Sequence, residues 1–151
     1  MTHANLHIDI SRHCKDWDID DASIQSVVMA ALRGFEVEET ELSIVLADDA
    51  FVRDLNKRYR DKDKPTNVLS FPQDTPPPNN MLGDIVLAFE TVEREAAEQD
   101  KGFAAHFTHL LVHGVLHLLG YDHISDDEAQ EMEALEIEIL DGLGVENPYT
   151  E

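Results

Sequence analysis

Residues 113–123 read HGVLHLLGYDH, and they continue an apolar segment that contains no proline. This composition predicts a buried helix. His113 and His117 lie four residues apart, about one helical turn, so their side chains project from the same face. Gly120 is suited to end the helix in the left-handed conformation, and the turn after it can bring His123 back toward the pair.

Three imidazoles that converge from a helix and its exit turn supply three corners of a tetrahedron, which suits zinc or a similar metal. A single His on an apolar helix is more often a core residue. Three His at this spacing around a helix-ending glycine favour a metal site instead. A fourth position is then left for water, as in catalytic zinc sites. We therefore predict one zinc ion per chain, bound by His113, His117 and His123.

The spacing His-x-x-x-His-x-x-Gly-x-x-His is that of metzincin proteases with one change. Those enzymes carry a Glu directly after the first His, where it acts as general base. Gly114 occupies that position here, and a glycine cannot accept a proton. Three neutral ligands leave a metal its full charge, so water at the site can ionise near pH 7 without that Glu. A metalloprotease stays open as an alternative, which Gly114 opposes.

Other polar residues near these ligands have more than one reading. His106 and His109 fall on the same side of the predicted helix as the pair, within an arc of about 80°. His109 is expected to support a ligand or to contact substrate, although a fourth ligand is an alternative. His106 is interpreted as a polar residue near the helix start. Asp122 either orients a ligand imidazole or makes the turn.

Apolar patterning and turn residues predict the rest of the fold. Strands are expected near residues 6–10 and at 42–46, 67–71 and 84–89. Helices are expected after a cap at Asp20 or Asp21, after Asp48, at 91–99, from about 103, and after Ser125. The first two strands flank a helix, which implies a parallel pair, and the last two flank a loop at 73–83, which implies an antiparallel pair. The fold class is α+β: one domain over residues 1–151, a four-stranded mixed sheet with about five helices, and a central buried His-bearing helix.

Charge is distributed unevenly along the chain. The net charge of −21 by itself argues against a nucleic-acid partner. However, six of the eleven basic residues lie within residues 53–64. Exposed charges act over about 8 Å at physiological salt, so such a patch can still hold phosphate, although a solvated helix face is the alternative. Arg60 is our candidate phosphate ligand, since a guanidinium stays charged and offers a planar fork of donors.

Cysteine usage and hydropathy indicate where the protein acts. The single Cys14 cannot form an internal disulfide, which fits a reducing cytosol. No apolar run approaches the ~20 residues of a membrane span, and the N-terminal residues do not resemble a signal peptide. We expect a cytoplasmic protein with no membrane partner.

Three segments together resemble the YbeY family of metal-dependent endoribonucleases, over about the whole chain: YRDKDKPTNVLSFP at 59–72, GDI at 83–85 and the histidine motif at 113–123. The resemblance implies a single-strand-specific endoribonuclease in ribosomal RNA maturation, including the small-subunit 3′ end, and in ribosome quality control. It implies zinc on His113, His117 and His123, with Arg60 as the functional arginine. The implied partners are single-stranded and ribosomal RNA and the ribosome or small-subunit proteins, with no DNA. A non-catalytic ribosome-assembly factor with a structural zinc is a further alternative.

Overall fold

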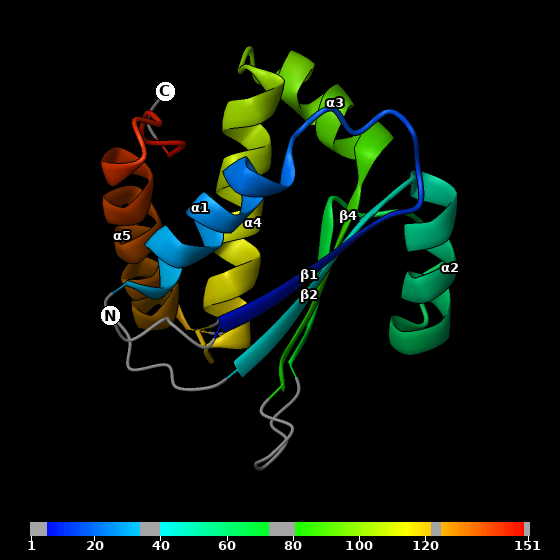
Figure 1. Ribbon diagram of the computed structural model, residues 1–151, viewed down its shortest axis with the longest axis horizontal. Coiled ribbons are helices and arrows are strands. Elements are labelled where there is room, and N and C mark those ends of the chain that lie inside the picture. Colours follow the sequence, from blue (N-terminus) through cyan, green and yellow to red (C-terminus); the bar gives the residue numbers. More distant parts are fainter. Residues whose placement is uncertain (1–5, 34–39, 73–80, 122–124, 150–151) are drawn as a thin grey trace.

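The computed structural model describes residues 6–33, 40–72, 81–121 and 125–149 (Figure 1). The elements in these ranges are, in chain order, β1 (Leu6–Arg12), α1 (Asp21–Leu32), β2 (Thr40–Ala47), α2 (Asp49–Arg60), β3 (Val68–Pro72), β4 (Met81–Ala88), α3 (Phe89–Glu98), α4 (Phe103–Leu118) and α5 (Asp126–Gly142). This arrangement confirms the predicted α+β class.

The strands form a mixed sheet in the order β1-β2-β4-β3, so β1 and β3 are its edges. β1 pairs with β2 in parallel, and β2 pairs with β4 in parallel. β3 and β4 are antiparallel, with Ser70 opposite Ile85. Both predicted pairings are therefore confirmed. β4 begins at Met81, before the predicted Asp84, because Gly83 still pairs with Pro72 in the antiparallel ladder.

Helices cover both faces of the sheet. Figure 1 shows α2 on one side and α1, α4 and α5 on the other. The larger core lies under α4, where Leu111, Val115 and Leu116 are fully buried. A smaller cluster under α2 contains Ala47, Val52, Leu69, Val86 and Ala88. Alternate residues of β4 thus serve opposite cores, as expected of a strand covered on both faces.

Side-chain caps place the helix starts. The carboxylate of Asp20 accepts a hydrogen bond from the Ser23 backbone amide at 2.9 Å, and Asp48 caps α2 in the same way. Ser125 and Glu128 form a reciprocal capping box at the start of α5. These caps confirm the predicted helix starts. Across the described ranges, no helix is long and apolar enough to cross a bilayer.

Two glycines determine how α4 lies and where it ends. A Cβ at Gly114 would lie 3.1 Å from Ile85 Cγ2 and 3.3 Å from Ser70 Oγ, so the missing side chain lets α4 approach the sheet closely. Gly120 has a φ of +106°, and its amide donates to the His117 carbonyl at 3.0 Å. The next amide, of Tyr121, reaches back to the Leu116 carbonyl, which satisfies the helix end. The predicted stop at Gly120 is confirmed.

Candidate active site

A pocket of about 800 Å³ lies between the end of α2, edge strand β3 and the C-terminal half of α4. Its lining consists of Tyr59, Arg60, Asn67, Val68, Ser70, Phe71, Pro72, His113, His117, Gly120 and Tyr121. The fold therefore brings Arg60, from one side of the sheet, to the same cavity as His113 and His117, from the other. The remaining predicted site residue, His123, and the neighbouring Asp122 lie outside the described residues.

His113 and His117 face one another through their Nε2 atoms, which are 3.0 Å apart. Two nitrogen ligands at about 2.0–2.1 Å from a tetrahedral zinc ion lie roughly 3.3 Å from each other. The spacing therefore fits two ligands of one metal ion after a small adjustment. Within the described ranges no group of three or more His, Cys, Asp or Glu side chains is placed to hold a metal.

The other ring nitrogen of His113 contacts a carboxylate. Nδ1 of His113 lies 2.5 Å from Oε2 of Glu136, a fully buried residue of α5. An ionised carboxylate can only accept, so Nδ1 of His113 donates to it, and in the neutral ring this leaves the Nε2 lone pair on the side of His117. Metal-binding imidazoles are commonly held by a carboxylate in this way. The hydrogen bonding of His113 is thus the one that a metal ligand requires.

Glu136 collects two further donors. Its Oε1 lies 3.1 Å from His109 Nε2 and also accepts a hydrogen bond from the Tyr149 hydroxyl. Burial alone would raise the pKa of Glu136, but hydrogen bonds from His109, His113 and Tyr149 outweigh it and lower the pKa to about 2. Burial, together with this contact, raises the pKa of Tyr149. The site therefore contains a buried carboxylate that is ionised at neutral pH. His109 contacts this carboxylate behind His113.

Glu136 and Tyr149 were not foreseen from the sequence. A signal for Glu136 was present, because it stands four residues after Met132 and four before Leu140, on the buried side of α5. A carboxylate in such a stripe needs hydrogen-bonding partners, so its position alone marks it as unusual. No comparable signal identifies Tyr149, which lies in the turn after α5 and contacts Glu136 from there.

His106 supports the pocket wall rather than the histidine pair. It is buried, and its Nε2 lies 2.9 Å from Oε1 of Glu95 on α3. Glu95 Oε1 also accepts from the side-chain amide of Asn67, which lines the pocket. Burial lowers the pKa of His106 despite the neighbouring carboxylate. His106 is a polar residue near the helix start, as predicted, but it is buried and holds Glu95 rather than facing solvent.

The turn after α2 fixes the position of Arg60. Asp61 adopts the left-handed conformation with a φ of +57°. Asn56 is buried; its side-chain amide donates to the Lys64 carbonyl at 2.8 Å, and its own carbonyl accepts from the Lys62 amide. The turn is thereby attached to the middle of the helix, with Arg60 at the pocket.

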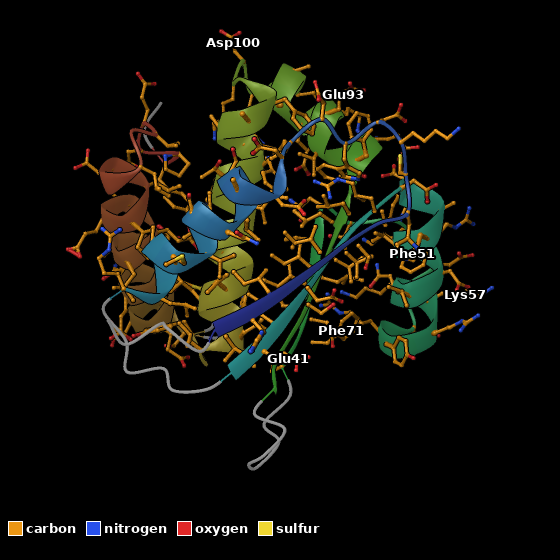
Figure 2. The ribbon with its side chains drawn as sticks, viewed as in Figure 1. Glu41, Phe51, Lys57, Phe71, Glu93 and Asp100 are labelled. Carbon is orange, nitrogen blue, oxygen red and sulfur yellow. The ribbon has the colours of Figure 1, made fainter. Side chains whose placement is uncertain are left out.

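Only part of the basic cluster is neutralised. Arg53 pairs with Asp63 and Arg58 pairs with Asp54, at 2.7 and 3.1 Å. The remaining cations, Lys57, Arg60, Lys62 and Lys64, are exposed and form no ion pair with any described residue. Lys57 points from α2 into solvent, whereas Phe71 lies between α2 and the sheet (Figure 2). We call Lys57, Arg60, Lys62 and Lys64 the cationic rim, and of these Arg60 lines the pocket.

An exposed aromatic side chain stands beside Arg60. Tyr59 is 68% exposed, and its ring meets the edge of Phe71 at a centroid distance of 5.7 Å. Both residues line the pocket. The Tyr59 ring therefore packs against Phe71 on one side and is open to solvent on the other, so it can stack on a planar ligand.

Comparisons with known proteins agree with this architecture. The family model described as Endoribonuclease YbeY matches residues 9–144. Proteins named Endoribonuclease YbeY from Sinorhizobium fredii and Parvibaculum lavamentivorans are 50% and 49% identical, covering 95% and 97% of this chain and 92% and 86% of their own length. The solution structure of TM1509 from Thermotoga maritima shares the fold, with a TM-score of 0.62, 23% identity and 91% of each chain covered. The chain therefore belongs to the YbeY family of endoribonucleases.

Proposed function

We propose that this chain is a zinc-dependent endoribonuclease that cuts single-stranded RNA during ribosomal RNA maturation, including the small-subunit 3′ end, and serves in ribosome quality control. Its proposed partners are ribosomal RNA and the small ribosomal subunit, in the cytoplasm. The observation that carries the proposal is the pocket in which Arg60 joins His113 and His117. Membership of the endoribonuclease family supports the class of reaction.

His113 and His117 would hold the metal through Nε2, and His123 is the proposed third ligand. When bound, zinc would lower the pKa of a water molecule toward neutrality and polarise a phosphoryl oxygen. Glu136 keeps the proton of His113 on Nδ1, away from the pocket. In the neutral tautomer with its hydrogen on Nδ1, His113 offers its Nε2 lone pair to the metal.

Arg60 is proposed to bind the scissile phosphate. Its guanidinium is exposed at the pocket and is not used by an ion pair with a described residue. Such a group can offer two parallel donors to a phosphate and stabilises charge that builds up there. The lysines of the cationic rim would hold neighbouring phosphates without entering the chemistry.

Tyr59 offers a reason for a preference for single strands. Stacking of a base on an aromatic side chain is worth about 1–3 kcal/mol and requires an unpaired, accessible base face. Tyr59 places such a surface next to Arg60. A base in a duplex is already stacked on its neighbours, so it can stack on Tyr59 only after an unfavourable unstacking step.

The alternatives fit the geometry less well. A peptidase base at position 114 is missing, and the space there is taken by the sheet, because a Cβ would already meet Ile85 and Ser70. A structural zinc site is normally closed by protein ligands. Here the histidine pair opens onto a pocket of about 800 Å³, which favours a site that admits substrate.

The decisive experiment incubates zinc-loaded protein with single-stranded RNA, duplex RNA and casein. We expect about one zinc per chain and cleavage of single-stranded RNA alone. His113→Ala and His117→Ala should lose both zinc and cleavage, whereas the exposed His7→Ala, the matched control, should retain both. Casein hydrolysis that depends on His117 would support the protease instead. Full zinc without cleavage of any substrate would support the assembly factor.

A further inference from the structure

A buried carboxylate lies behind the histidine pair and is contacted by two imidazoles and a phenol. Glu136 is fully buried, and its donors come from α4 and from the turn after α5. We propose that Glu136 is a positioning residue that fixes His113 in the tautomer and orientation needed for metal binding. This inference rests on the proposed function, since it takes His113 to be a zinc ligand.

The two carboxylate oxygens divide the contacts. Oε1 accepts from His109 and Tyr149, and Oε2 accepts from His113 at 2.5 Å. The contacts to Oε1 restrain the carboxylate from two directions. Oε2 therefore presents one fixed acceptor to His113. With Nδ1 held there, the opposite nitrogen of the same ring is directed toward Nε2 of His117, 3.0 Å away.

The cost of this arrangement argues against a purely structural role. Moving a carboxylate from water into a protein interior is unfavourable, so the hydrogen bonds from His109, His113 and Tyr149 have to offset that cost. Glu136 occupies the same helical stripe as Met132 and Leu140, where an apolar side chain would bury surface without that cost. A connection between α4 and α5 alone is therefore better made by Leu or Met. Control of His113 explains why an ionisable group stands here.

The first test measures zinc affinity by competition with a chromophoric chelator. Glu136→Leu removes the acceptor, and Glu136→Gln keeps one neutral oxygen. Loss of such a partner weakens metal binding by about 10- to 100-fold, so we expect Gln near the lower end and Leu near the upper end. Glu138→Gln, an exposed position on the same helix, is the matched control and should bind zinc like wild type. Circular dichroism verifies that each variant is folded.

A second measurement needs no variant. Nitrogen-15 spectra of the imidazole rings in metal-free wild-type protein report which nitrogen of His113 carries the hydrogen. We expect hydrogen on Nδ1 and none on Nε2. The opposite tautomer would overturn the inference even if the Glu136 variants failed to fold. Wild-type zinc affinity in folded Glu136→Leu would also overturn it, while leaving the proposed function intact. Failure of wild-type protein to bind zinc would instead overturn the proposed function.

Discussion

Arg60 is the residue whose side chain most directly tests the proposed chemistry. It shares the pocket with His113 and His117 but belongs to α2. Arg60→Glu should lower the rate of RNA cleavage by at least about 100-fold, because a donor that stabilises developing charge is replaced by a repulsive one. Arg60→Lys keeps the charge and loses the fork, so it should remain clearly impaired. Initial rates on single-stranded RNA measure both effects, with zinc content and melting temperature unchanged.

The control for this prediction is Arg53, which lies on the same helix and pairs with Asp63. Arg53→Ala should leave the cleavage rate close to that of wild type. If Arg60→Ala cleaves like wild type while Lys62→Ala does not, the phosphate ligand is a lysine of the cationic rim and Arg60 has been assigned wrongly.

The packing around Gly114 explains why this position of the histidine motif is a glycine. Its position lacks a protease base, and the structure adds that α4 packs against the sheet there. Gly114→Ala gains about 1 kcal/mol of helix propensity but forces a methyl group to 3.1 Å from the fully buried Ile85. Overpacking of this kind costs about 1–3 kcal/mol, so the net free energy of unfolding should fall by about 1 kcal/mol. Urea unfolding measures the change, and Gly142→Ala, where a Cβ meets nothing within 4 Å, is the matched control.

The contact between His106 of α4 and Glu95 of α3 should make the free energy of unfolding depend on pH. Burial lowers the pKa of His106, which faces Glu95, His109 and Lys101. The unfolded chain therefore binds a proton below about pH 6.5 while the folded chain does not, and stability falls as the pH decreases from there toward the lowered pKa. His106→Gln should remove this loss, which is at most about 1.4 kcal/mol per pH unit.

Urea unfolding of wild type and His106→Gln at a series of pH values tests this prediction. The difference between the two proteins should shift steadily in favour of the variant as the pH falls from about 7.5 to about 5.5. Parallel curves would mean that His106 takes up its proton equally well in the folded chain, and the interpretation of the His106–Glu95 contact would be wrong.

Local chemistry explains how much of these elements could be predicted. The caps at Asp20, Asp48 and Ser125 and the stop at Gly120 follow from interactions between residues close in sequence. The parallel β1–β2 pair and the antiparallel β3–β4 pair follow from the order of strands, helix and loop along the chain. The contact of Glu136 with His113 depends instead on how α5 packs against α4, which no local pattern encodes. The same holds for Arg60, the last residue of α2, which lines the pocket together with His113 and His117 of α4.

On the scale of the whole molecule, RNA binding must overcome an unfavourable charge. The chain carries a net charge of −21, and RNA is a polyanion. Long-range repulsion is screened over about 8 Å at physiological salt, so the cationic rim can act only on phosphates brought close to the pocket. Binding should therefore be weak at low salt for its number of contacts, because the less screened repulsion from the net negative charge offsets part of the attraction.

The dependence of RNA affinity on salt separates these two contributions. Each phosphate contact adds about 0.7 to the slope of log affinity against log salt for single strands. Lys62→Ala should reduce that slope by about 0.7 and weaken binding of all sequences alike. Glu138→Gln on α5 removes one negative charge without touching the rim, so it should leave the slope unchanged. If both substitutions change the slope equally, the net charge governs association and the rim is not a phosphate-binding surface. Unequal slopes with Lys62 dominant would place the RNA backbone along the end of α2.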